Sequence, residues 1–179
     1  METVTGGTFT ESLFRNGAIR PGCNRKKDKQ AWQTSASSAA QAHSTGAALG
    51  QMHKALADFT LSRPNSLGVS AFRPLAMRCT AQGLDAISEG LAARIFAECD
   101  YLEAHWPTNL PVAAIHADLF PDNVPMLGDN VTGLIDFYFA CSEIRAYDLA
   151  VTHSAWCFSS DGKIFDAQVS RSEERRVGK

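Results

Sequence analysis

The sequence lacks a surplus of positive charge, a long apolar run and a paired-cysteine motif. Its 179 residues include 17 Lys and Arg against 19 Asp and Glu, so the basic surface on which general nucleic-acid binding depends is absent. No apolar stretch approaches the roughly 18 residues that a membrane span needs. The length and the 45% hydrophobic content suit one globular domain with a single core and exclude two full enzyme domains.

The five cysteines, at positions 23, 79, 99, 141 and 157, form no C-x-x-C pair. Their odd number and irregular spacing fit neither a zinc site nor a closed disulfide framework. Residues 1–15 lack the basic start and apolar stretch of a signal peptide. We therefore expect a cytoplasmic protein in which the cysteines are small core residues.

Composition divides the chain into three parts. Residues 1–44 are rich in Gly, Ser, Thr, Gln and Ala and show no lasting apolar periodicity, which predicts an irregular segment. Residues 45–167 have the periodic patterns of a folded domain. Residues 168–179 include six charged side chains among twelve and are predicted to be a charged, solvated tail.

Two helices are predicted in the first half of the domain. Leu49, Met52, Leu56 and Phe59 recur at steps of three and four, which predicts a helix that ends near Arg63. A longer helix is predicted from Leu84 to Trp106, with Pro107 beyond its end. Its apolar stripe consists of Leu84, Ile87, Leu91, Ile95, Phe96, Cys99, Leu102 and Trp106.

After residue 111 the spacing of the apolar residues becomes shorter, as in β-strands. Residues 112–115 read as a buried strand, and residues 124–127 and 131–135 flank a Gly-Asp-Asn turn, which predicts a hairpin. Pro125 removes a ladder donor, so the first arm is expected to be an edge or irregular. A last helix is predicted from Tyr147 to about Phe158. The fold class is α+β, mostly helical with a small β-hairpin.

The most informative stretch begins at His116. It has the spacing H-x-D-x-x-x-x-N, with Asp118 and Asn123, and Asp136 follows thirteen residues later in Leu-Ile-Asp-Phe. This is the catalytic-loop pattern of phosphoryl-transferring kinases. A carboxylate at Asp118 accepts the proton of an attacking hydroxyl, and the oxygens of Asn123 and Asp136 suit Mg²⁺. The hairpin is expected to return Asp136 to the side of Asn123.

Two further polar residues are interpreted as structural. His116 is expected to brace the loop more than to touch a substrate. Asp148 lies in the first turn of the predicted last helix, where a carboxylate suits the helix dipole and favours a cap or a brace. The alternative for the whole motif is a loop whose polar residues merely satisfy one another.

The sequence resembles the kinase-like small-molecule phosphotransferases, which include aminoglycoside phosphotransferases, choline kinases and one type of bacterial homoserine kinase. The likeness is greatest to the homoserine kinases and covers roughly residues 45–167. The stretches that carry it are residues 50–53, 59–65, 115–124, 133–141, 146–150 and 155–158.

The resemblance implies the carboxy-terminal lobe of a protein-kinase-like fold and a set of roles. Asp118 would be the catalytic base, and Asn123 and Asp136 would bind Mg²⁺ with ATP as co-substrate. The implied reaction converts ATP and L-homoserine to O-phospho-L-homoserine, on the route to threonine. The implied partners are ATP and a small-molecule alcohol, with no nucleic acid and no membrane.

The acceptor pocket is less defined. Kinases for cationic alcohols often place acidic groups directly after the Asp-Phe pair, where this chain has Tyr138 and Phe139. Homoserine carries a carboxylate, so a basic or backbone donor should face it, and Arg145 is one candidate beside the alternative of an ordinary surface arginine.

The family's amino-terminal lobe, with its phosphate-covering loop and strand lysine, is not recognisable before residue 45. The lysines, at positions 26, 27, 29, 54, 163 and 179, do not lie in an apolar strand. A fragment without that lobe is therefore expected, and its exposed lobe interface favours self-association. The alternatives are an inactive kinase-like remnant or binding module, and a kinase for choline or an aminoglycoside.

Overall fold

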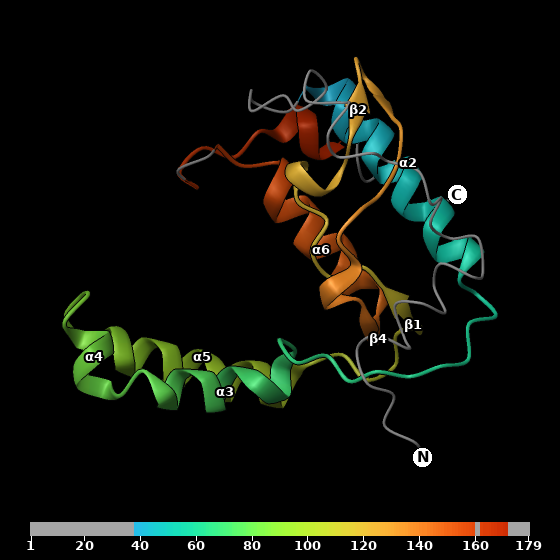
Figure 1. Cartoon of the computed structure of the whole chain (residues 1–179). Helices are drawn as coiled ribbons and strands as arrows, with labels where there is room; N and C mark the ends of the chain where they lie inside the picture. The colour runs from blue at the N-terminus through green and yellow to red at the C-terminus, as the bar shows by residue number, and fades with distance from the viewer. Residues whose placement is uncertain (1–37, 160–161, 172–179) are drawn as a thin grey trace. The chain divides into compact units, whose positions relative to one another are not determined.

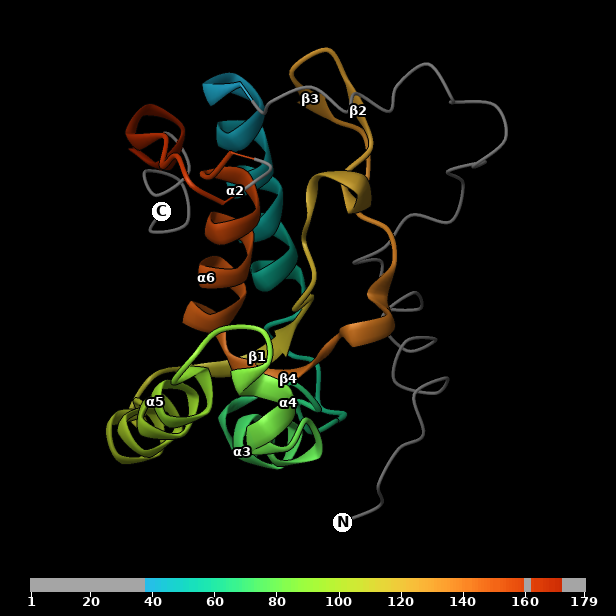
Figure 2. The ribbon, with the colours of Figure 1, turned by 90° about the vertical axis from the view of Figure 1, so that its left-hand side faces the viewer.

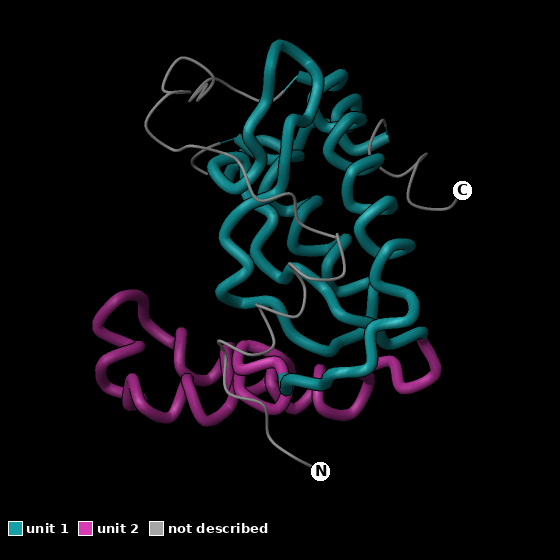
Figure 3. The backbone as a smooth tube through the Cα atoms, turned by 45° about the vertical axis from the view of Figure 1, so that its right-hand side comes forward, with its two compact units in different colours: residues 1–64, 111–179 teal, residues 65–110 magenta. Residues whose placement is uncertain are grey.

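The computed structural model describes residues 38–159 and 162–171. Within these ranges the chain forms two compact units, shown in Figure 3. Unit 1 contains the residues up to Pro64 and those from Pro111 onward, and unit 2 contains Asn65–Leu110. Residues 1–37 of the predicted irregular segment 1–44 lie outside the described residues, so for them the prediction stays untested.

Helix α2 (Ala39–Ala55) opens unit 1 and begins six residues before the predicted domain start at Thr45. Its first turn is held by a capping box. The Ser38 hydroxyl accepts the N–H of Gln41 at 3.1 Å, and the Gln41 side chain accepts the N–H of Ser38 at 3.2 Å. The prediction that residues 39–44 are irregular is therefore wrong, because a Ser-x-x-Gln cap offsets the weak apolar content of that turn.

The core of unit 1 lies between α2 and α6 (Arg145–Trp156), which pack against each other (Figure 2). Leu49, Met52 and Leu56 are buried there, as the periodicity predicts. Helix α2 ends at Ala55, however, and Phe59 packs against the core from the segment that follows. Helix α6 begins two residues before the predicted start at Tyr147.

A two-stranded antiparallel sheet joins β1 (Val112–Ile115) to β4 (Cys141–Ile144), as Figure 1 shows. The prediction of β1 is confirmed. Strand β4 was not predicted, because Glu143 interrupts its apolar pattern and its partner lies far away in the sequence. The register pairs Ile115 with Cys141 and Val112 with Ile144.

The predicted hairpin is present but short. Strands β2 (Met126–Leu127) and β3 (Asn130–Val131) enclose a turn at Gly128 and Asp129, and Gly128 has a left-handed φ of 61°. The Pro125 carbonyl accepts the N–H of Thr132 at 2.9 Å. Pro125 has no N–H to return that bond, so the ladder ends there. Residues 132–135 are not a strand, contrary to the prediction.

Unit 2 contains three helices where one was predicted. They are α3 (Val69–Arg78), α4 (Ala81–Asp85) and α5 (Leu91–His105). The predicted continuous helix breaks at Gly90, which adopts a left-handed φ of 72°. The Asp85 carboxylate accepts the N–H of Ala92 at 2.9 Å and so caps α5. The predicted stripe is wrong at Ile87, which lies in the break and is 77% exposed.

The beginning of the predicted tail is ordered. Residues 167–171 form a helical turn, and Val169 and Ser170 are buried. Val169 belongs to the core cluster of unit 1, and the Ser170 hydroxyl lies 2.8 Å from Nε2 of His153. The prediction that 168–171 are a solvated tail is therefore wrong, whereas residues 172–179 lie outside the described ranges. No helix of the described chain is long and apolar enough to span a membrane.

The cysteines differ in accessibility. Cys99, Cys141 and Cys157 are buried, whereas Cys79, at the end of α3, is exposed, contrary to the expectation of a core residue. Burial raises the pKa of the Cys141 thiol to about 12. Cys23 lies outside the described residues.

We expect iodoacetamide at pH 8 to modify Cys79 in the folded chain at least about tenfold faster than the three buried cysteines. The thiolate is the reactive species, and Cys141 forms almost none at this pH. Peptide mapping by mass spectrometry measures each cysteine separately, and urea should equalise the rates. Equal rates without urea would contradict the burial of Cys141.

Candidate active site

The loop that follows β1 carries most of the predicted site. The Phe120 N–H donates to the Asp118 carbonyl and the Asn123 N–H to the Phe120 carbonyl, both at 2.9 Å. Pro121 then starts the short 3₁₀ helix η1 (Pro121–Asn123). Ala117 adopts a left-handed φ of 63°, a conformation that costs a non-glycine residue about 1 kcal/mol. The loop is therefore tightly wound and held in a strained conformation.

Asp118 and Asn123 are in direct contact. Asn123 Nδ2 donates to the Asp118 carbonyl at 2.7 Å and to carboxylate oxygen Oδ2 at 3.1 Å. Both partners are acceptors, so the amide orientation is determined and Oδ1 faces the other way. The Asp-to-Asn step of the motif thus places a carboxylate and an amide side by side.

Asp136 follows Ile135, whose backbone forms hydrogen bonds with residues at both ends of this loop. The Ile135 N–H donates to the Asn123 carbonyl at 3.0 Å, and the Ile135 carbonyl lies 2.9 Å from Nε2 of His116. Asp136 itself is exposed and has a left-handed φ of 62°. No described side chain bonds to its carboxylate. The structure thus holds the Asp136 backbone beside Asn123.

The donor set suits a hard cation that brings other ligands with it. Asn123 Oδ1 and the Asp136 carboxylate are oxygen donors, as Mg²⁺ prefers, and Mg²⁺ commonly takes the rest of its ligands from phosphate and water. No cluster of three or more His, Cys, Asp or Glu within the described ranges has the geometry of a metal site. These residues therefore fit Mg²⁺ carried by a nucleotide better than a metal held by protein ligands alone.

His116 is fully buried and links the loop to the segment before Asp136. Its Nδ1 lies 3.3 Å from the Asp118 N–H, which only donates, and Nε2 faces the Ile135 carbonyl, which only accepts. The ring is therefore the neutral tautomer with its proton on Nε2. It also packs on Phe137, with 4.4 Å between the ring centroids. Burial lowers the pKa of His116, although Asp148 and the Ile135 carbonyl act in the opposite direction.

The neutral His116 predicts acid sensitivity. The unfolded chain takes up a proton near pH 6.5, whereas burial lowers the pKa of the folded ring. The unfolded state therefore binds more protons, and stability falls as the pH drops below about 6.5. The slope from this residue reaches at most about 1.4 kcal/mol per pH unit. Urea denaturation between pH 7 and pH 5 measures it. His116→Phe should lack this component, and an unchanged slope would contradict it.

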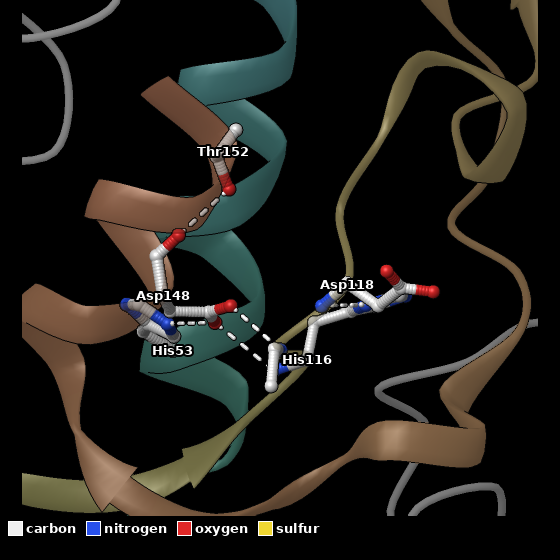
Figure 4. A network of polar contacts seen from close by, with 6 residues as sticks. His53, His116, Asp118, Asp148 and Thr152 are labelled. Atoms are coloured by element: carbon white, nitrogen blue, oxygen red, sulfur yellow. Dashed lines mark hydrogen bonds and ion pairs between the residues drawn. The ribbon is translucent and has the colours of Figure 1, made fainter. Parts of the chain in front are cut away.

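Asp148 is fully buried, and Figure 4 shows its carboxyl group pointing toward His116 at the start of the loop. Oδ2 accepts the N–H of His116 at 3.0 Å and lies 2.8 Å from Nε2 of His53, and Oδ1 accepts the N–H of Ala117 at 2.8 Å. The Thr152 hydroxyl donates to the Asp148 carbonyl at 2.8 Å. Asp148 thus fixes the two peptides before Asp118.

His53 was not predicted as part of this network. It lies in the last turn of α2 and is 4% exposed. The sequence does contain one indication of a buried role for His53, because it lies four residues after Leu49, on the apolar face of a predicted helix. A polar residue on such a face needs a buried partner, but the sequence alone does not identify Asp148 as that partner.

The remaining candidates lie apart from each other. Tyr138 follows Asp136 in the 3₁₀ helix η2 (Phe137–Phe139) and is 69% exposed. Arg145 is exposed, and its N–H donates to the Pro111 carbonyl at 3.1 Å. Arg145 therefore begins α6 at the opposite end of β1 from Asp118. Tyr138 lies two residues after Asp136, whereas Arg145 does not lie at the loop.

The Asp118 carboxyl points away from the Asp148 network in Figure 4. Burial raises its pKa, with smaller contributions from Asp122 and Asp136, while His116 and the bond from Asn123 lower it. A carboxyl whose pKa is raised is a better proton acceptor than an ordinary aspartate. The arrangement suits a group that orients a hydroxyl and takes its proton.

Comparisons with known proteins agree on one family. The description of the phosphotransferase enzyme family matches residues 21–177. The chain is 45% identical over 144 residues to a homoserine kinase of Zymomonas mobilis and 55% identical over 117 residues to one of Methylobacterium radiotolerans. These matches cover 80% and 65% of this chain, respectively.

Solved structures show the same fold. An aminoglycoside-3'-phosphotransferase of type VIII superposes with a TM-score of 0.50 at 26% identity, covering 81% of this chain and 56% of that one. A macrolide 2'-phosphotransferase from Brachybacterium faecium superposes with a TM-score of 0.56 at 18% identity, covering 82% and 48%. The chain spans only 45% and 36% of the two homoserine kinases.

Proposed function

The chain belongs to the phosphotransferase enzyme family, and from this premise we propose that it carries the catalytic residues of an ATP-dependent kinase for L-homoserine. Residues 45–167 are the proposed carboxy-terminal lobe of that kinase, and the product is O-phospho-L-homoserine. The proposed location is the cytoplasm, where ATP is available.

The observation that carries the proposal is the contact between Asp118 and Asn123 beside a tethered Asp136. Phosphoryl transfer passes through a loose transition state, so the protein must mainly orient the hydroxyl and neutralise phosphate charge. Asp118 orients the hydroxyl and accepts its proton. Asn123 and Asp136 would hold Mg²⁺, which would supply neutralisation of the charge on the phosphates of ATP.

The choice of acceptor rests on the relatives and on one residue. The homoserine kinases above are 45% and 55% identical to this chain, whereas the aminoglycoside-3'-phosphotransferase is 26% identical. Tyr138 follows the Asp-Phe pair where an acidic residue would favour a cationic acceptor. A zwitterionic acceptor is therefore favoured over choline or an aminoglycoside.

The test incubates the 179-residue chain with Mg-ATP and one of three acceptors: L-homoserine, choline or kanamycin. Phosphorus NMR identifies the product, and ADP release gives the rate. We expect O-phospho-L-homoserine and little product from the other two acceptors. Faster turnover of choline or kanamycin would favour the alternative kinase, and no turnover with any acceptor would favour an inactive remnant.

A further inference from the structure

Arg63 lies in the segment between α2 and α3, yet its backbone is tied to β4. The Ser142 N–H donates to the Arg63 carbonyl at 2.7 Å, and the Arg63 N–H donates to the Ser142 hydroxyl at 3.1 Å. Both polar backbone atoms of Arg63 are thereby fixed. Pro64, which follows, restricts the conformation further. The base of this side chain is therefore held in place.

The guanidinium of Arg63 extends toward the segment that carries Asp136. Nη1 donates to the Tyr138 carbonyl at 2.7 Å, and Cζ lies 6.0 Å from the centroid of the Tyr138 ring. This distance is at the limit of a cation–π contact. Arg63 is half-buried, whereas the Tyr138 ring is mostly exposed. The positive charge of Arg63 thus lies beside Tyr138, which follows Asp136 by two residues.

Most N–H groups of the Arg63 guanidinium form no hydrogen bond within the described part of the chain. It has five N–H bonds, and only one hydrogen bond within the described part of the chain uses them. No described carboxylate forms an ion pair with it. Arg73 in unit 2 differs, because both Asp100 and Glu103 pair with its guanidinium. Among the described residues, Arg63 is therefore a cation held in place without a paired anion.

We propose that Arg63 binds the carboxylate of the amino-acid acceptor, an inference that rests on the proposed function. Asp118 and Asp136 make the site negative, so an acceptor carboxylate is repelled unless a cation faces it. A guanidinium matches a carboxylate with two parallel hydrogen bonds. Asp118 then orients the hydroxyl at one end of the acceptor while Arg63 holds the carboxylate at the other.

The test compares L-homoserine with L-homoserinamide, which has the same size and hydroxyl but no negative charge. Isothermal titration measures the binding of each to the full chain with a non-hydrolysable Mg-ATP analogue present. We expect the wild-type chain to prefer homoserine at least about tenfold. Arg63→Gln should weaken homoserine binding about 10- to 100-fold and change homoserinamide binding less than about twofold.

Three comparison variants sharpen the result. Arg63→Lys keeps the charge but not the paired geometry, so it should recover part of the preference. Lys54→Gln removes an exposed positive charge on α2 and should leave the preference intact. Arg145→Gln tests the arginine that the sequence suggested as a candidate. If this variant, and not Arg63→Gln, selectively lost homoserine binding, the proposal would be overturned.

Other outcomes also decide. Equal weakening of both ligands by Arg63→Gln would show that Arg63 only supports Tyr138, and a wild-type chain that binds no homoserine or shows no preference would overturn the proposal outright. Selective binding without phosphorylation would leave Arg63 assigned and refute the kinase activity. If Arg63→Gln left homoserine phosphorylation unchanged, the kinase activity would stand and the role of Arg63 would be refuted.

Discussion

Asp118→Asn is expected to lower kcat for homoserine phosphorylation by at least about 10³-fold, while the KM for Mg-ATP changes little. Removing a general base typically costs about 10²–10⁴-fold, and Asp118 also orients the hydroxyl. The asparagine oxygen still accepts the bond from Asn123 Nδ2, so the loop keeps its shape. Steady-state ADP release measures the loss.

The same variant should melt at a slightly higher temperature than the wild-type chain, as thermal unfolding followed by circular dichroism would measure. Burial raises the pKa of Asp118, so the folded state binds its proton more tightly than the unfolded state, and the ionised carboxylate costs stability at neutral pH. That cost appears as the pH rises through the raised pKa and is absent at low pH. Neutral asparagine removes it.

Asp122→Asn is the matched control for Asp118→Asn. Asp122 lies in the same loop and is exposed, so this variant loses the same charge without losing the proposed base. We expect less than about a threefold change in kcat. Similar losses in the two variants would show that the loop needs negative charge in general, and unchanged turnover in Asp118→Asn would remove the proposed base.

Asp148→Asn is expected to lower the free energy of unfolding by about 2–4 kcal/mol. The buried carboxylate accepts bonds from two backbone N–H groups and contacts His53, all on its two oxygens. An asparagine has one acceptor oxygen, so its NH₂ group would face a donor. Urea denaturation at pH 7 measures the loss.

The exposed Asp58 provides the control for this second variant, since Asp58→Asn removes an exposed charge three residues after the end of α2. We expect less than about 0.5 kcal/mol from it. A double-mutant cycle with His53→Gln isolates the coupling between His53 and Asp148. A loss below about 0.5 kcal/mol in Asp148→Asn would contradict the described network.

Features encoded locally were predicted well from the sequence. The spacing of Asp118, Asn123 and Asp136, strand β1 and the turn of the hairpin depend on residues close in the chain, and the comparisons confirm the family that this motif indicates. The roles of the three residues stay predictions. The structure supplies what spacing alone cannot give, namely the contact of Asn123 with Asp118.

Features that depend on distant partners were missed. Strand β4 forms because β1 presents free backbone groups, which its own sequence does not reveal. Likewise, His53 is explained only by Asp148, 95 positions away. The break between Asp85 and Leu91 is different, because the apolar spacing continues across it although the helix stops at Asp85 and Gly90 adopts a left-handed φ.

The pairing of β1 with β4 has a consequence for how the molecule opens. Ile115 and Cys141 are cross-strand partners, so every candidate phosphate-handling residue lies on a closed loop between them. Pairing of the two strands closes this loop, and the entropic cost of closing it grows only slowly with loop length. Amide hydrogen exchange should therefore find this stretch opening as one cooperative unit, while extra residues at the Gly128 tip leave its opening free energy almost unchanged.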